Sequence, residues 1–339
     1  IWEGHKLTQE EATEISGIST VFWLSKFNDV LQTLMSEVSH VYLNTNEHLR
    51  ASTEVETRDD RFINWCQKQY PLHHYERTAP IMSNLRAVKD EEEIKAMQTA
   101  CDITEKGFKR VAQFVRPGVM EYEIEAEYAH EFLRNRSRGF GYTPIVASGA
   151  NSCVLHYVDN NQQCQDGDIL LMDIGAEYGN YNADMTRCLP VNGKFSKRQK
   201  EVYNAVLRVM REAIQMLAPG ILIPEYQKEV GKVMESELLG LGLLNNTDVK
   251  NQTANNPAYK KYFMHGTSHH IGLDVHDVAN IYQKLKPGMV LTVEPGIYIR
   301  EENLGIRLEN NVVISDYGIK DLMANIPIEV EEIEELMNS

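Results

Sequence analysis

The sequence predicts an α+β fold in which helices pack over a strongly curved, mostly antiparallel sheet. Two patterns predict it: apolar residues recur at helical spacing in four segments, and strand-like apolar runs lie between those segments. The composition agrees, because 42% hydrophobic and 24% charged residues over 339 positions are ordinary for a globular protein that buries a core.

Four helices are expected in the larger, C-terminal part of the chain. The first covers residues 94–114 and ends before Arg116-Pro117-Gly118. The second covers 121–136 and the third 196–217. Pro224 opens the fourth, which ends between residues 240 and 242.

Strands are expected where short apolar runs lie between these helices. Their ranges are 143–147, 169–174, 181–191, 289–293 and 306–314. The Asn- and Thr-rich stretch 245–256 is expected to be a surface loop, and the acidic stretch 329–335 a solvated helix face.

Residues 1–88 show little sustained periodicity and are predicted to form a separate domain from residues 89–339. A short strand is expected over 41–43 and a helix over 61–69. Because the chain opens at Ile1 rather than Met, we expect a fragment or a processed form.

The charge and the cysteines restrict the function classes. With 34 Lys+Arg against 49 Asp+Glu, the net charge of −15 argues against nucleic-acid binding, which needs a basic patch. No apolar run reaches the length of a membrane span, so membrane insertion is not expected. Five scattered cysteines without a C-x-x-C pair favour a reducing compartment and hence a cytoplasmic location.

Two aspartates stand in unusually apolar surroundings. Asp173 ends the run Ile169–Met172, and Asp184 lies within the next expected strand. If the two runs form a hairpin, Asp173 and Asp184 face each other across neighbouring strands, where they repel unless they share a proton or a cation. The alternative is one capping or turn aspartate and one exposed aspartate.

Two glutamates repeat this pattern further along the chain. Glu294 ends the run 289–293 and precedes Pro295-Gly296. In the last strand, alternation places Arg307 and Glu309 on one face. A surface Arg–Glu pair would explain the second case alone, but a fourth carboxylate in an apolar setting favours a shared site.

Four histidines fall within twelve positions, at His265, His269, His270 and His276, in a stretch that glycines make irregular. Imidazole and carboxylate without cysteine form a ligand set that suits manganese, cobalt or iron, with zinc possible. Four carboxylates and one imidazole can hold two divalent ions if two carboxylates bridge them, and such a pair of ions activates a shared water for hydrolysis.

Other chemistries lack support in the sequence. No G-x-G-x-x-G or P-loop precedes a helix, which argues against kinase and dinucleotide-binding functions. No serine lies in a G-x-S-x-G elbow.

Several separated motifs occur in the order found in one known family. They are 171–187 (LMDIGAEYGNYNADMTR), 263–277 (FMHGTSHHIGLDVHD), 291–298 (LTVEPGIY) and 306–314. Over residues 82–327 the chain resembles the M24 metallopeptidases of the creatinase, or pita-bread, fold, and most closely the aminopeptidase P group. The resemblance implies a pita-bread catalytic domain over 89–339, preceded by a partial creatinase-like domain whose first strands are missing.

The resemblance implies a site with two divalent ions, Mn²⁺ in the first place and Co²⁺, Fe²⁺ or Zn²⁺ as alternatives. Asp184 and Glu309 would bridge the ions, Asp173 would bind one ion, and His269 with Glu294 the other. Glu294 would also accept a proton from the bridging water, as a general base.

Five further residues match the catalytic surroundings of the family. His156 corresponds to a histidine near the scissile bond, and His265 and His276 to histidines that orient the substrate carbonyl. Arg307 would support the ligands by ion pairing, and Tyr298 matches a tyrosine beside the site.

The activity implied is release of the N-terminal residue from peptides with proline in the second position. Prolidases carry a different motif at 264–269, so an Xaa-Pro dipeptidase is the runner-up, and His270 replaces a tryptophan often found there. A non-catalytic binding module and a metal-free creatinase-type enzyme are weaker alternatives. A homo-oligomer, either dimer or tetramer, is expected from the same resemblance.

Overall fold

The computed structural model describes residues 2, 4–45, 47 and 54–339. The chain divides into two compact units, Ile1–Met82 and Ser83–Ser339. Helix α4 (Ala79–Ala87) runs across the boundary between them.

The first unit combines short helices with a pair of parallel strands. The strand expected at 41–43 and the helix expected at 61–69 are confirmed, as β1 (His40–Leu43) and α3 (Arg58–Gln69). Strand β1 pairs with β2 (His74–Arg77). Helices α1 (Gln9–Ser16) and α2 (Phe27–Glu37), with the 3₁₀ turn η1 (Leu24–Lys26), were not expected. Helix α1 buries none of its residues and lacks an apolar stripe. Helix α2 carries apolar residues at helical spacing, at Phe27, Val30, Leu31, Leu34 and Met35, but only Met35 is buried.

All four expected helices are present in the second unit. They are α5 (Glu91–Phe114), α6 (Glu121–Arg134), α7 (Lys197–Met216) and α8 (Ile223–Gly240). Asp90 and Ser196 begin α5 and α7 with reciprocal capping boxes, and Pro224 lies in the first turn of α8.

Shorter helical elements complete the second unit. They are α9 (Asn246–Asn251), α10 (Val330–Met337) and the 3₁₀ turns η2 (Gly149–Cys153), η3 (Ala258–Lys261) and η4 (Arg300–Glu302). The loop expected over 245–256 is therefore partly wrong. The Asn- and Thr-rich sequence caps a helix there, because the Asn245 side chain accepts from the N–H groups of Thr247 and Asp248.

The strands of the second unit are antiparallel, as expected. One sheet has the order β3-β4-β7 and another β12-β11-β8, while β9 pairs with β10 and β5 with β6. The bounds are β3 (Ile145–Ser148), β4 (Ile169–Asp173), β5 (Glu177–Tyr178), β6 (Tyr181–Asn182), β7 (Thr186–Pro190), β8 (Val290–Val293), β9 (Gly296–Ile299), β10 (Leu304–Arg307), β11 (Asn310–Ser315) and β12 (Gly318–Asp321).

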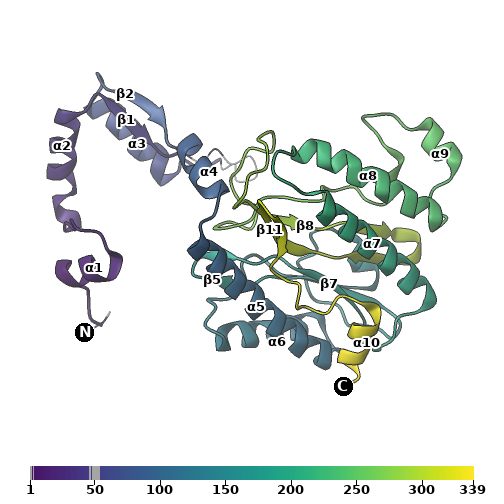
Figure 1. The fold of residues 1–339 in the computed structure, drawn as a ribbon. Coiled ribbons are helices and arrows are strands. Elements are labelled where there is room, and N and C mark those ends of the chain that lie inside the picture. Colours follow the sequence, from purple (N-terminus) through teal and green to yellow (C-terminus); the bar gives the residue numbers. More distant parts are fainter. Residues whose placement is uncertain (1, 3, 46, 48–53) are drawn as a thin grey trace. The chain divides into compact units, whose positions relative to one another are not determined.

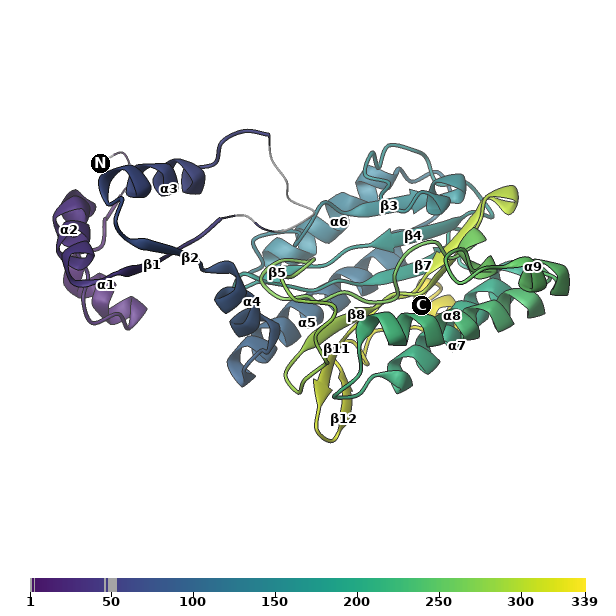
Figure 2. The same cartoon turned by 90° about the horizontal axis from the view of Figure 1, so that it is seen from above.

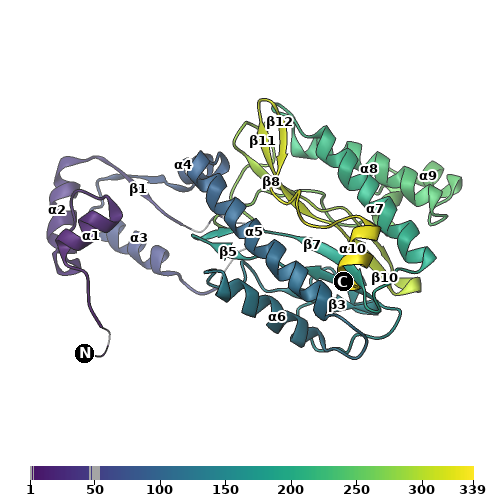
Figure 3. The ribbon, with the colours of Figure 1, turned by 60° about the horizontal axis from the view of Figure 1, so that its bottom comes forward.

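Helices cover these strands on two sides. Helices α5 and α6 lie against each other, α7 and α8 form a second pair, and the strands run between the two pairs (Figures 1 and 2). The C-terminal helix α10 contacts both α5 and α7 (Figure 3). Within the described part of the chain, no helix is both long and apolar enough to cross a membrane.

Both of the longest predicted strands are interrupted. Residues 181–191 form β6 and β7 with a break at 183–185, and 306–314 form β10 and β11 with a break at 308–309. The breaks hold Asp184 and Glu309. Asn311 supports the first, because its side chain accepts from the Asp184 N–H at 2.9 Å and donates to the Asp184 carbonyl at 2.7 Å. The N–H of Glu309 donates to the Thr186 carbonyl at 3.1 Å, so the two breaks are joined.

Gly175 is required where the chain turns between Asp173 and Asp184. A Cβ atom at this position would lie 1.7 Å from the carbonyl oxygen of Ala183. We expect Gly175→Ala to lower the free energy of unfolding by about 3 kcal/mol, because backbone must move to admit the methyl group. Gly240→Ala is the matched control, since nothing lies within 4 Å of its Cβ position. Urea unfolding measures both, and equal stability of the two variants would contradict this account.

Candidate metal centre

Each of the four expected carboxylate ligands stands where a strand ends or breaks. Asp173 is the last residue of β4 and Glu294 directly follows β8. Asp184 and Glu309 lie in the two strand breaks, and His269 lies in the irregular segment before β8. Strand ends place side chains at an edge where the backbone is free to bend, so residues far apart in the sequence meet there.

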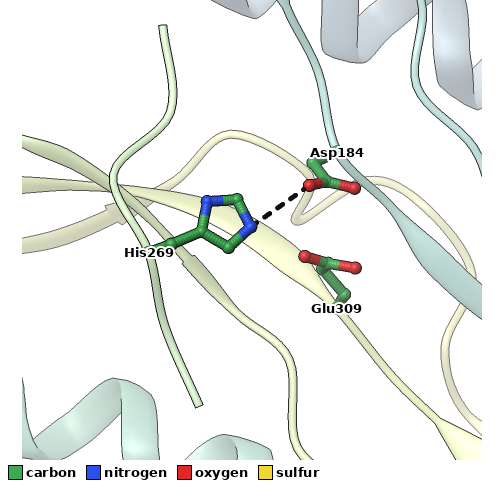
Figure 4. A group of neighbouring side chains, drawn as sticks. All are labelled: Asp184, His269 and Glu309. Atoms are coloured by element: carbon green, nitrogen blue, oxygen red, sulfur yellow. Dashed lines mark ion pairs between the residues drawn. The ribbon is translucent and has the colours of Figure 1, made fainter. Parts of the chain in front are cut away.

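Three of the five form a compact group (Figure 4). Asp184, His269 and Glu309 each offer one ligand atom, and these atoms lie within 4.8 Å of one another. Nε2 of His269 lies 3.5 Å from Oδ2 of Asp184. Asp184 is 5% exposed and Glu309 1%, so the group is largely out of solvent.

Asp173 and Glu294 adjoin this group. Oε1 of Glu294 lies 3.6 Å from Nε2 of His269. The hydroxyl of Tyr142 lies 2.6 Å from Oδ1 of Asp173 and 2.5 Å from Oδ1 of Asp184. The structure therefore brings all five predicted ligands to one place.

The expected hairpin pairing differs in detail. Strands β4 and β7 are antiparallel neighbours, but Thr186, not Asp184, lies opposite Asp173. Asp184 reaches the site from the break two residues earlier, and the Tyr142 hydroxyl bridges it to Asp173. The alternative of a turn aspartate and an exposed aspartate does not hold, because Asp184 is buried and interacts with Asp173 through Tyr142.

Sequence reasoning missed Tyr142. A phenol has one proton to donate, so it satisfies two close carboxylates fully only if one of them is itself protonated. Burial and the charges of Asp173 and Asp184 raise the pKa of Tyr142 well above its usual value, which keeps the hydroxyl protonated. Nothing in the sequence around position 142 distinguishes this tyrosine from one packed in the core.

Arg307 connects the carboxylates to the histidine side of the site. Its Nη2 donates to Oδ2 of Asp173 at 2.6 Å and its Nη1 donates to the Tyr298 hydroxyl at 2.8 Å. The Tyr298 hydroxyl lies 2.8 Å from Nε2 of His265. Since Arg307 is 3% exposed, the alternative of a surface Arg–Glu pair is wrong.

Thr186 and Arg187 fix the backbone beside Glu309. The Thr186 hydroxyl donates to Oε2 of Glu309 at 2.6 Å and accepts from Nε of Arg307 at 3.1 Å. Arg187 is fully buried, and its Nη1 donates to the carbonyls of Thr186 at 3.0 Å and Glu309 at 2.8 Å. These hydrogen bonds from the guanidinium satisfy backbone carbonyls that the interrupted strand would otherwise leave unpaired.

His269 presents one nitrogen to the carboxylates. Its Nδ1 lies 3.0 Å from the carbonyl of His270 and donates to it, which leaves Nε2 facing Asp184 and Glu294. Burial alone would lower the pKa of His269, but the interactions with Asp184 and Glu294 outweigh it and raise the pKa to about 9.

Three of the carboxyl groups, those of Asp184, Glu294 and Glu309, hold protons unusually tightly. Burial, and then the charge of Asp173, raise the pKa of Asp184 to about 6. Burial raises the pKa of Glu294 to about 7, although His269 opposes the shift. The pKa of Glu309 is raised well above its ordinary value by burial and by the charges of Asp184 and Glu294. These shifts have a common cause, which is negative charge crowded into a space with little water.

The site fits divalent cations. Oε1 of Glu309 is buried and has no hydrogen-bond partner, although a buried carboxylate oxygen is costly to leave unsatisfied. One imidazole nitrogen and four carboxylates converge on the same space. Asp173, Asp184, His269, Glu294 and Glu309 are therefore the residues that would hold the ions.

The remaining predicted residues surround this group at different depths. The rings of His276 and His269 are 4.5 Å apart between centroids. His265 packs edge-on to Tyr298, and burial, together with the charge of Arg307, lowers its pKa to about 3. His156 is exposed, and its charge contributes to the lowered pKa of His265.

A buried ion pair holds the histidine-rich segment. Nζ of Lys89 lies 3.0 Å from Oδ2 of Asp277, the residue after His276, and both side chains are 1% exposed. His270 is also buried, and its Nδ1 has no hydrogen-bond partner. Sequence reasoning overlooked Lys89 and Asp277 because they are 188 positions apart.

Comparison with known proteins identifies the family. The family described as "Metallopeptidase family M24" matches residues 95–316, and the domain described as "Aminopeptidase P, N-terminal domain" matches residues 1–42. The chain belongs to metallopeptidase family M24. The Xaa-Pro aminopeptidase of Haemophilus influenzae is 37% identical over 99% of this chain and 78% of its own length, and that of Escherichia coli 38% identical over 99% and 79%.

Solved structures of M24 proteins share the fold. Escherichia coli aminopeptidase P in its low-pH form has a TM-score of 0.88 at 36% identity, covering 99% of this chain and 79% of that one. Proline aminopeptidase P II of Yersinia pestis has a TM-score of 0.87 at 32% identity, covering 99% and 80%. The fold is thus the α+β pita-bread fold, and this M24 protein is a metallo-aminopeptidase whose site takes divalent metal ions.

The raised pKa values predict that metal binding releases protons. Near pH 6.5, His269, Glu294 and Glu309 hold protons that a cation must displace, so Mn²⁺ affinity should rise as the pH increases toward about 9, the pKa of His269. Calorimetric titration of metal-free protein at about pH 6.5, in two buffers of different ionisation enthalpy, measures the release. His269→Ala should release about one proton fewer. Binding without proton release would contradict the electrostatic description of the site.

Proposed function

We propose that this M24 enzyme releases the N-terminal residue from peptides that carry proline in the second position. The observation that carries the proposal is the convergence of Asp173, Asp184, His269, Glu294 and Glu309 around the unpartnered Oε1 of Glu309. The preference for proline is supported by the relatives named Xaa-Pro aminopeptidase.

In this proposal the five residues would hold two divalent ions, and Asp184 and Glu309 would contribute to both. When bound, the ions supply Lewis-acid chemistry: they polarise the scissile carbonyl and make water a stronger nucleophile at neutral pH. Mn²⁺ is the ion we propose, since carboxylate-rich sites with one imidazole suit it.

Glu294 is the proposed general base. Its Oε1 lies 3.6 Å from Nε2 of His269, so its carboxylate stands beside the proposed ion site, where it can accept a proton from the attacking water and return it to the leaving nitrogen.

The histidines and Arg307 are proposed to position the substrate. Because the pKa of His265 is low, its ring is neutral and acts through hydrogen bonds rather than charge. His276 lies against His269, and His156 stands at the exposed side, where both can reach the peptide. Arg307 and Tyr298 hold Asp173 and His265 in place.

We propose three further features of the protein on the basis of its sequence. They are the division into a creatinase-like domain at 1–88 and a catalytic domain at 89–339, a homo-oligomeric state, and a cytoplasmic location. The last is supported by the cysteines, which are all free and buried.

The function is tested by comparing a tripeptide and a dipeptide. With Mn²⁺ added, the enzyme should release alanine from Ala-Pro-Ala much faster than from Ala-Pro. Preference for Ala-Pro would identify a dipeptidase, and turnover of Ala-Ala-Ala equal to that of Ala-Pro-Ala would remove the proline requirement. Protein without bound metal and without metal-dependent turnover would indicate a binding module instead.

Two substitutions separate ligands from positioning residues. Asp184→Ala should lose metal and activity together, because this carboxylate is shared in the proposed site. His276→Ala should keep the metal but lower kcat by about 100-fold, as removal of a proton-transfer or positioning group does. Metal content and kcat measured on the same preparations check both, and metal loss in His276→Ala would overturn its assignment.

A further inference from the structure

A cavity of about 370 Å³ is lined in part by the residues that directly precede two of the proposed catalytic histidines in the chain. Three segments line it: Ala150 and Cys153 in η2 with Val154 and Leu155 directly after it, Met264 in the histidine-rich segment, and Arg300 with Asn303 around η4. Leu155 precedes His156 and Met264 precedes His265. Arg300 follows β9, two residues after Tyr298. The cavity thus adjoins the site along three chain segments.

The wall of the cavity is firmly built. Strand β10 packs against η2 so closely that a Cβ atom on Gly305 would lie 2.1 Å from the carbonyl of Ser152. The Gly305 N–H donates to the Ser152 hydroxyl at 2.8 Å. A rigid wall can discriminate between ligands, because it does not adapt to a poor fit.

The lining is apolar except for the amide of Asn303 and the guanidinium of Arg300. Val154 is 52% exposed and Met264 37%, so both offer open apolar surface. Arg300 carries the only charge among the described lining residues and forms no ion pair with a described carboxylate. The nearby Glu302 is engaged elsewhere, with Nε of Arg198 at 2.8 Å. An apolar cavity with one available guanidinium suits a short chain that ends in a carboxylate.

We propose that this cavity is the subsite for the third residue of the peptide and that Arg300 selects a carboxylate there. The inference rests on the proposed function. Only one residue precedes the scissile bond of an aminopeptidase substrate, and proline follows it. An extended peptide advances about 3.5 Å per residue, so the third residue is the first that can pass beyond His156 and His265 to the adjoining cavity.

The carboxylate has two possible sources, an acidic side chain at the third position and the free carboxyl end of a tripeptide. Four peptides distinguish them: Ala-Pro-Glu-amide, Ala-Pro-Gln-amide, Ala-Pro-Lys-amide and the free acid Ala-Pro-Gln. For the native enzyme we expect kcat/KM to be about tenfold higher for Glu-amide than for Gln-amide, the worth of one charge-assisted hydrogen bond. A gain for the free acid alone would assign the carboxyl end as the source.

Charge reversal at Arg300 is the decisive variant. Arg300→Glu should invert the ratio of kcat/KM for Glu-amide over Lys-amide, whereas the control Arg134→Glu makes the same change of net charge on the exposed face of α6 and should keep the native ratio. An unchanged ratio in Arg300→Glu, or equal changes in both variants, would overturn the subsite. A kcat/KM that depends on the charge of the first residue instead of the third would also overturn the subsite.

The same assay separates failure of the subsite from failure of the function. Turnover of Ala-Pro-Gln-amide by the native enzyme tests the proposed aminopeptidase, and the charge ratios test the cavity. If no Xaa-Pro peptide is cleaved, the proposed function is wrong and the subsite falls with it.

Discussion

Repulsion between buried carboxylates is the constraint to which the rest of the site responds. Asp184 and Glu309 lie close together with little access to solvent, and Asp173 and Glu294 adjoin them. Two carboxylates so placed are stable only with a shared proton, a cation or strong hydrogen-bond donors. Tyr142, Thr186 and Arg307 supply donors to these carboxylates, and Oε1 of Glu309 remains for an ion.

The sequence revealed the candidate ligands because charge in an apolar strand is costly and so rarely accidental. Asp173 and Glu294 are where the pattern put them, at strand ends. Asp184 and Glu309 were expected inside strands but lie in strand breaks. Side chains in a regular strand alternate between two faces, and a break frees both carboxylates from this pattern so that they can point toward each other. That detail depends on Asn311, 127 positions from Asp184, and no local pattern encodes such a contact.

The helices also show that some features follow from the local sequence and others depend on contacts with distant residues. The predicted range of α7 was correct to within a residue at each end, because its apolar stripe is buried and Ser196 caps its start. Helix α1 was missed although Thr8 caps it equally well, since none of its residues is buried. A cap marks where a helix can begin, but a buried face shows that it forms part of a core.

The histidine-rich segment connects the chemistry of the site to the stability of the fold. It has no regular structure, so its conformation depends on individual contacts. Lys89 and Asp277 anchor it at one end, and Asn182 holds it further back by donating from its N–H to the Gly272 carbonyl at 2.9 Å. Removing one member of a buried pair costs about 3–5 kcal/mol, far more than an exposed pair contributes. Because Asn182 lies two residues from Asp184, the contacts that shape the segment bearing His269 and His276 also fix a carboxylate of the proposed metal site. Loosening the Lys89–Asp277 pair should therefore weaken cation binding before it unfolds the domain.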